Sequence, residues 1–102
     1  MIHNRLDITK YKFFNELESL SFIEAIILYG SRARKDERER SDIDLAIKCP
    51  FSTNQEWLKV LEIIENADTL LKIDCVRLDQ LSDKNPLKES ILREGVVLFQ
   101  RK

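Results

Sequence analysis

The apolar residues of the chain repeat with either a helical or an extended spacing. Between residues 9 and 20, the apolar side chains of Phe13, Leu17 and Leu20 recur every three or four positions, while lysines and glutamates fill the positions between them. This spacing places the apolar side chains along one helical face, so it predicts a first helix over this stretch.

A second helix is predicted over residues 53–66. Thr53 and Glu56 stand three positions apart, as in a capping box, in which each side chain satisfies a free backbone amide at the start of a helix. Three apolar residues then fall on one helical face: Trp57, Leu61 and Ile64. The pattern indicates an amphipathic helix that covers a sheet.

Four stretches have the extended pattern. Residues 22–29 form a nearly continuous apolar run that stops at a glycine, and residues 42–47 alternate between apolar and polar side chains. Residues 70–78 are rich in Leu, Ile and Val, with Asp74 as their central polar interruption, and residues 96–99 are again apolar. We therefore predict four strands.

A last helix is predicted between the third and fourth strands. Asn85 can cap it, Pro86 suits its first position, and Gly95 can close it. The order of elements predicts an α+β fold, with one small mixed β-sheet covered by helices. Residues 1–102 are too few for two ordinary domains, so we expect a single domain.

Composition narrows the possible partners. Charged residues make up 34% of the chain, but 17 Lys and Arg nearly balance 18 Asp and Glu, which leaves a net charge of −1. Such a balance gives no overall attraction to nucleic acid or to an anionic membrane. The alternating charges of residues 34–40 have no aromatic residue between them and are typical of a solvated loop rather than of a nucleic-acid site. No signal peptide or membrane span is recognisable, so we expect a cytoplasmic protein.

The rarer residues exclude several chemistries. His3 is the only histidine, so Ser-His-Asp and Cys-His mechanisms are not expected. The two cysteines, Cys49 and Cys75, are too far apart for a CxxC pattern and are expected to be reduced. With only Gly30 and Gly95, the chain contains neither a Walker A loop nor a GxGxxG turn.

The alternating strand carries two carboxylates on one face. Asp42 and Asp44 are two residues apart and therefore project to the same side, while Ile43 and Leu45 project to the other. Like charges at one point require a compensating cation, and oxygen ligands suit Mg²⁺ or Mn²⁺. Asp74 would complete a metal site of three carboxylates if its strand lay beside this one in the sheet.

A second candidate site stands at the end of the first apolar strand. Gly30 would allow a phosphate to approach the backbone, and the Ser31 hydroxyl can donate a hydrogen bond to a phosphate oxygen. Arg32 and Arg34 follow directly and could neutralise a triphosphate. Ser31 could equally act as the cap of a short helix, a role compatible with the first.

Structural roles compete with these assignments. The paired strand carboxylates could form salt bridges with Arg38 and Arg40, which lie a few residues before them. Asp74 could be a structural acid paired with Lys72 or Arg77. Metal binding is favoured for the pair because a phosphate turn precedes it at a fixed spacing.

This spacing resembles a known motif. Gly30-Ser31, ten intervening residues and Asp42-Ile43-Asp44 are similar to the GS-x10-DxD motif of the DNA polymerase β-like nucleotidyltransferase superfamily. The resemblance implies that Asp42, Asp44 and Asp74 are the catalytic metal ligands, and that Gly30 and Ser31 grip the nucleotide phosphates. It also implies a nucleotidyltransferase fold, two Mg²⁺ ions and ATP as substrate.

The element order and the ending of the chain, residues 91–99, resemble in particular the minimal nucleotidyltransferases, which are often antitoxins paired with HEPN-domain toxins. That resemblance implies transfer of AMP from Mg-ATP to a hydroxyl, with a tyrosine of a HEPN toxin as the expected acceptor. Lys35 departs from the family pattern, because many relatives have glycine there. Beyond this module we expect no domain for holding an acceptor.

Two other functions remain open. The protein could be a non-catalytic antitoxin that inhibits its partner by binding alone, or it could transfer a nucleotide to a small molecule. The second alternative is weakened by the expected lack of an acceptor domain.

Overall fold

The computed structural model describes residues 7–102, so His3 lies outside the described residues. The elements along the chain are η1 (Ile8–Lys10), α1 (Lys12–Glu18), β1 (Ala25–Tyr29), α2 (Ser31–Arg34), β2 (Ile43–Lys48), α3 (Asn54–Glu65), β3 (Ile73–Arg77), η2 (Leu78–Gln80), α4 (Pro86–Glu94) and β4 (Val96–Gln100).

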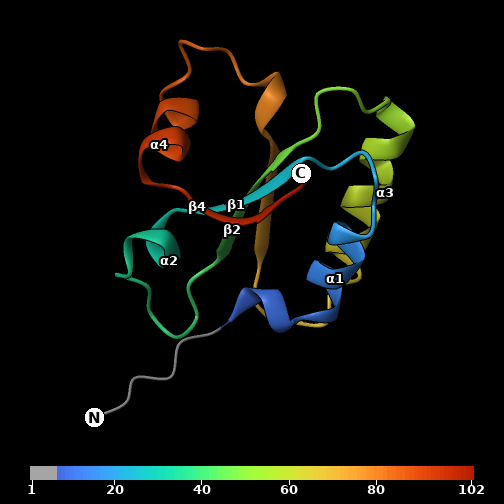
Figure 1. Cartoon of the computed structure of the whole chain (residues 1–102). Helices are drawn as coiled ribbons and strands as arrows, with labels where there is room; N and C mark the ends of the chain where they lie inside the picture. Colours follow the sequence, from blue (N-terminus) through green and yellow to red (C-terminus); the bar gives the residue numbers. More distant parts are fainter. Residues whose placement is uncertain (1–6) are drawn as a thin grey trace.

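The strands form one mixed sheet in the order β3-β2-β1-β4. β1 is antiparallel to both β2 and β4, whereas β2 and β3 are parallel. In Figure 1, α1 and α3 lie on one side of the sheet, and α4 lies on the other with α2. The predicted α+β fold with a mixed sheet is thereby confirmed.

The alternation along β2 divides the interior into two layers. Ile43, Leu45 and Ile47 are fully buried in a cluster with apolar side chains of α1 and α3. Ala46, on the opposite face, is buried in a second cluster with Ile91 of α4 and with residues of β1 and η2. Asp44 has the same parity as Ala46 and therefore belongs to the α4 face of the sheet.

Several element boundaries differ from the prediction. The first helix is divided, because Asp7 caps η1 and Tyr11 is extended between η1 and α1. Strands expected over residues 22–29 and 70–78 are limited to Ala25–Tyr29 and Ile73–Arg77. Each of these apolar runs is longer than the segment of it that pairs with a neighbouring strand.

The predicted face of the second long helix is partly wrong. Leu61 is 39% exposed, whereas Val60, which was not assigned to the buried face, is fully buried. Trp57 and Ile64 do pack against the core, as expected. The core-facing stripe of α3 is therefore rotated by about one residue from the predicted one.

The predicted caps of the two long helices are confirmed, whereas the alternative role of Ser31 as a cap is wrong, because Gly30 caps α2 and Ser31 is its first residue. Thr53 and Glu56 form the reciprocal capping box of α3, and the Asn85 side chain accepts from the amide of Leu87 at the start of α4. Gly95 closes α4, but its φ of −67° is one that any residue adopts. Glycine is favoured there because a Cβ would collide with the carbonyl oxygen of Ile91 and the Ile27 side chain.

Within residues 7–102, none of the helices combines the length and the apolar character needed to cross a membrane.

Candidate functional site

Three polar side chains of the candidate site stand in a row across three strands. In the parallel pair of β2 and β3, Asp44 is the direct partner of Asp74. In the antiparallel pair of β1 and β2, Asp44 is the direct partner of Tyr29. Direct partners in neighbouring strands point to the same face, so Tyr29, Asp44 and Asp74 share the α4 face of the sheet. The strand adjacency required by the proposed carboxylate cluster is therefore present.

Burial and neighbouring negative charges raise the pKa of two members of this row. Burial, followed by the charges of Asp74 and Asp42 and a hydrogen bond with Asp74, raises the pKa of Asp44, while Arg34 opposes the shift. Burial, followed by the charges of Asp44 and Asp74, raises the pKa of Tyr29 to about 12. A positive charge placed between these groups would relieve the repulsion.

The glycine turn packs directly on this row. Gly30 has φ 73° and ψ −154°, a conformation that side chains disfavour, and a Cβ added there would collide with the Asp44 carboxylate. The carbonyl of Gly30 accepts from the amides of Ala33 and Arg34, which begins the short helix α2 at Ser31. The phosphate turn expected from the sequence and Asp44 are thus immediate neighbours.

The two arginines of the predicted phosphate site have different surroundings. Arg32 is 7% exposed, and its guanidinium donates to the carbonyl oxygens of Ser41 and Asp42. Arg34 is exposed, donates to Asp36 at 3.3 Å, and lies 3.6 Å from Glu94. Only Arg34 contributes to the electrostatics of Asp44.

Asp42 precedes β2 by one residue and is partly exposed. Its negative charge reaches Asp44, since it helps to raise the pKa of that carboxyl. Among the described residues, however, no three His, Cys, Asp or Glu side chains are grouped closely enough to hold a metal ion. The strand register does bring two carboxylates together, those of Asp44 and Asp74, and oxygen ligands of this kind suit Mg²⁺ or Mn²⁺.

Of the two ion pairs considered as a structural role for Asp74, only the one with Lys72 is formed. Lys72 Nζ lies 3.6 Å from an Asp74 carboxylate oxygen, but both side chains are well exposed, at 70% and 43%. An ion pair in such a position contributes little to stability. Arg77 pairs with Asp79 instead, at 3.0 Å. The weak pair leaves Asp74 available for a cation.

Cys75 is not part of the site. It follows Asp74 in β3, so its side chain projects to the opposite face, where it packs with the core. Burial raises the pKa of its thiol to about 12, and both Cys75 and Cys49 are free thiols, as predicted.

Two residues near the site were not predicted from the sequence. Tyr29 is the last residue of the apolar run before Gly30, which is the one signal that could have identified it. Glu94 ends α4, and its Oε2 atom is buried without a hydrogen-bond partner beside Arg34. Because Glu94 is distant from the motif in sequence, only the packing of α4 brings it to Arg34.

The turn after α2 reflects the departure at Lys35. Lys35 adopts a left-handed conformation with φ 66° and ψ 27°, which is costly for any residue with a side chain. Many members of the family that the sequence resembles have glycine at this position. Residues 35–40 contain no helix or strand, in agreement with the loop predicted over residues 34–40, whereas Arg34 belongs to α2.

The chain is similar to known proteins over most of its length. The family model described as "Polymerase beta, Nucleotidyltransferase" matches residues 12–102. Two proteins of Methanocaldococcus jannaschii, both named "Putative protein adenylyltransferase", are 27% and 28% identical to the chain over 75 residues. The alignments cover 74% of this chain in both cases, and 75% and 74% of the relatives.

Solved structures share the fold. A crystal structure of a toxin-antitoxin with AMP-PNP matches with a TM-score of 0.58 and 19% identity, over 84% of this chain and 68% of the other. A mutant of the toxin-antitoxin MntA-HpeT matches with a TM-score of 0.64 and 20% identity, over 96% of this chain and 76% of the other. At these identities the likeness concerns the fold alone.

Proposed function

Since the chain belongs to the Polymerase beta nucleotidyltransferase family, we propose that it transfers AMP from Mg-ATP to a hydroxyl of a partner protein and acts as an antitoxin. In this reaction, the acceptor oxygen forms a bond to the α-phosphorus of ATP, and the bond to pyrophosphate breaks. The observation that carries the proposal is the arrangement of the Asp44 and Asp74 carboxylates in register, directly beside the Gly30 turn.

The turn and its flanking residues are suited to the triphosphate. Gly30 has no side chain to separate a phosphate from the backbone, and Ser31 supplies a hydroxyl donor at the start of α2. Arg34 is exposed and close enough to influence Asp44, so its guanidinium can turn from Asp36 and Glu94 toward a phosphate. We assign nucleotide binding to Gly30, Ser31 and Arg34.

The carboxylates are suited to the cation that accompanies ATP. Asp44 and Asp74 would hold it. Asp42 does not form a group of three with them among the described residues, and we propose that it joins them as a third ligand when the cation binds. A bound divalent cation supplies positive charge to the triphosphate and lowers the pKa of the acceptor hydroxyl. The remaining contribution of the chain is to hold the reactants in position and to complement their charge.

The acceptor that we propose is a tyrosine of a HEPN-domain toxin. The relatives named as protein adenylyltransferases favour a protein acceptor, and the toxin-antitoxin structures favour a toxin as this partner. If the toxin cleaves RNA, a bulky, negatively charged adenylate on a tyrosine of its active site would repel and block the RNA, which would inactivate the toxin.

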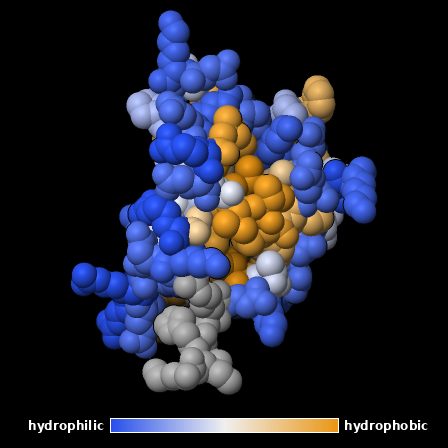
Figure 2. All heavy atoms as spheres, turned by 60° about the vertical axis from the view of Figure 1, so that its left-hand side comes forward, coloured by the Kyte–Doolittle hydropathy of each residue, from blue (hydrophilic) through white to orange (hydrophobic). Residues whose placement is uncertain are grey.

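The surface of the molecule supports binding to another protein. Leu92 of α4 and Val96 and Val97 of β4 are 64%, 44% and 53% exposed. Figure 2 shows an apolar patch on this side of the molecule. A groove of about 450 Å³ adjoins it, with Leu92, Val97 and Ile27 among its lining residues. We propose that the α4–β4 patch, defined by Leu92 and Val97, which line this groove together, contacts the toxin.

The proposal is tested by co-expression of the chain with the product of the adjacent gene, which we expect to be a HEPN-like toxin, and by intact-mass spectrometry of that product. We expect this protein to co-purify with the chain and, after incubation with Mg-ATP, to gain the mass of one or more adenylates on a tyrosine. The Asp42→Asn and Asp44→Asn variants should retain the complex but leave the partner unmodified.

Other outcomes would favour the alternatives. If the wild-type protein and both variants inhibit an unmodified partner equally, the chain is a binding antitoxin without catalysis. If only a small hydroxylated compound becomes adenylylated, the acceptor assignment is wrong while the nucleotidyltransferase site stands.

A further inference from the structure

Arg32 has an unusual position for a residue next to a phosphate turn. Its side chain is 7% exposed, although a guanidinium is always charged. Its Nε donates to the carbonyl oxygens of Ser41 and Asp42 at 3.2 and 3.3 Å, and its Nη2 donates to Ser41 at 2.7 Å. The forked guanidinium thereby binds two consecutive carbonyls at the entry to β2.

These bonds connect the two halves of the site. Arg32 belongs to α2, which begins at the Gly30 turn, and its side chain holds the backbone immediately before the alternating strand. The amide of Ile43 donates to the carbonyl of Lys72 at 2.8 Å, which joins the same segment to the strand that carries Asp74. The backbone around Asp42 is therefore held from both sides.

We propose that Arg32 is a positioning residue that fixes the Asp42 backbone, and with it the carboxylates of β2, for binding a divalent cation. This inference rests on the metal site of the proposed function. It replaces the expectation that Arg32 neutralises the triphosphate, since a guanidinium bonded to two carbonyls would have to give up these hydrogen bonds to reach a phosphate.

The two roles predict opposite effects on the binding of a cation without nucleotide. If Arg32 served only as positive charge for phosphates, its removal would reduce repulsion and tighten the binding of a bare cation. If Arg32 positions the ligands, its removal weakens that binding. Residues that orient metal ligands typically contribute about 10- to 100-fold to metal affinity.

The test is calorimetric titration of the full chain with Mn²⁺ in the absence of nucleotide. We expect Arg32→Met to weaken Mn²⁺ binding by about 10- to 100-fold, and Arg32→Lys to lie between Arg32→Met and wild type. A lysine retains the charge but lacks the fork that reaches two carbonyls. If the methionine variant does not fold, the lysine variant alone carries the comparison with wild type.

Arg77 provides a matched control. It is also buried, at 9% exposure, and its guanidinium also donates to two backbone carbonyls, those of Cys49 and Ser52. It stands at the last position of β3, away from Asp74 at the beginning of that strand. Arg77→Met should lower the melting temperature while leaving Mn²⁺ affinity unchanged.

Three results would overturn the inference. Unchanged or tighter Mn²⁺ binding by the Arg32 variants would restore a direct role with phosphates. If Arg77→Met weakened Mn²⁺ binding as much as Arg32→Met does, the effect would be one of general destabilisation. Absence of Mn²⁺ binding by the wild-type protein would overturn the proposed metal site itself, and the positioning role with it.

Discussion

Asp44 lies between a turn that leaves no room for a side chain and a second carboxylate. The raised pKa of Asp44 means that, just above the ordinary carboxyl range, the folded protein binds more protons than the unfolded chain. The free energy of unfolding therefore falls as pH rises through this window. Above the raised pKa, the ionised Asp44 carboxylate destabilises the folded protein by its full amount. A bound cation would remove this destabilisation.

We predict that Asp44→Asn stabilises the metal-free protein, and that the gain grows as pH rises from about 4 to about 7. Urea unfolding at both pH values in the presence of a chelator measures it. Asp83→Asn is the control, with the opposite expected effect on stability. A hydrogen bond from Lys88 lowers the pKa of Asp83, so this carboxylate stabilises the fold at neutral pH and loses that contribution as pH falls. A destabilised Asp44→Asn would identify a structural carboxylate instead.

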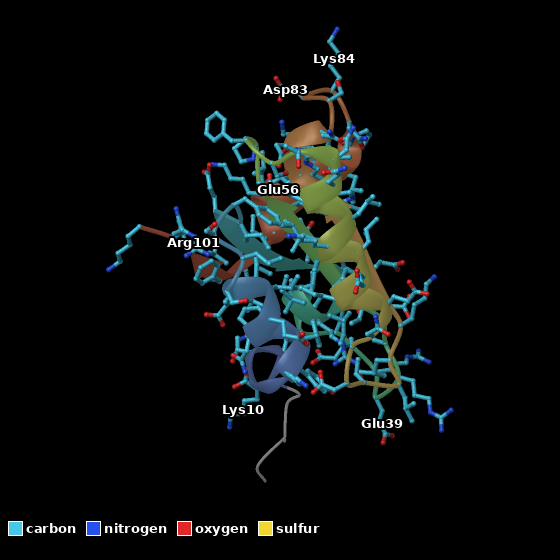
Figure 3. All side chains as sticks on the ribbon, turned by 90° about the vertical axis from the view of Figure 1, so that its right-hand side faces the viewer. Lys10, Glu39, Glu56, Asp83, Lys84 and Arg101 are labelled. Atoms are coloured by element: carbon cyan, nitrogen blue, oxygen red, sulfur yellow. The ribbon has the colours of Figure 1, made fainter. Side chains whose placement is uncertain are left out.

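The control lies far from the candidate site. In Figure 3, Asp83 and Lys84 project from one end of the molecule, while Glu39, in the loop before β2, projects from the other. The effects of Asp44→Asn and Asp83→Asn should accordingly be additive in the double variant.

Lys35 offers a second test at the residue scale. Its left-handed conformation costs about 1–2 kcal/mol for a residue with a Cβ, so Lys35→Gly should raise the free energy of unfolding by about 1 kcal/mol after the extra entropy of unfolded glycine is included. Lys35→Ala removes the same charge but retains the strain, and should give no such gain. Equal stabilisation by both variants would assign the effect to charge.

Most of the candidate site could be predicted from the sequence because its residues are close together along the chain. Gly30, Ser31, Asp42 and Asp44 are joined by a short spacing, and the alternation of β2 determines the common face of its carboxylates. The burial of Arg32 could not be predicted, because it depends on where the backbone of residues 41 and 42 lies in three dimensions. Sequence patterns for charged side chains favour exposure.

Among the secondary-structure elements, the position of Asp74 depends on which strand pairs with β2, and the prediction of four strands does not answer that question. The apolar patterns predicted four strands, but they contain no information on whether β3 adds beside β2 or beside β4. Parallel pairing with β3 places Asp74 opposite Asp44. A slip of one residue would move Asp74 to the core face, where its charge would be buried.

The junction of α4 and β4 gives a prediction at the same scale. A Cβ at Gly95 would meet the Ile91 carbonyl oxygen and come within 2.6 Å of the Ile27 side chain, so α4 would have to move away from the sheet. We expect Gly95→Ala to lower the free energy of unfolding by about 1–3 kcal/mol. Leu92→Ala, at an exposed position of the same helix, should change it by about 0.5 kcal/mol or less. A neutral Gly95→Ala would show that this junction is not tightly packed.

At the scale of the whole molecule, two surfaces with apolar residues can be compared. Leu92 of the α4–β4 patch and Leu58 of α3 are similarly exposed, at 64% and 60%, but α4 and α3 lie on opposite sides of the sheet (Figure 1). We predict that Leu92→Asp abolishes co-purification of the partner protein and that Leu58→Asp does not, because a charge desolvated in an interface is costly. The reverse result would move the partner to α3.

We propose that the Gly30 turn and the carboxylates of β2 and β3 form one nucleotide site that depends on a divalent cation. Without a cation, the clustered carboxylates repel a triphosphate. Calorimetric titration of the full chain with ATP, in excess Mg²⁺ and then in EDTA, measures this dependence directly. We predict binding in Mg²⁺ that is lost in EDTA and in the Asp44→Asn variant. Equal ATP affinity in Mg²⁺ and in EDTA would contradict the claim.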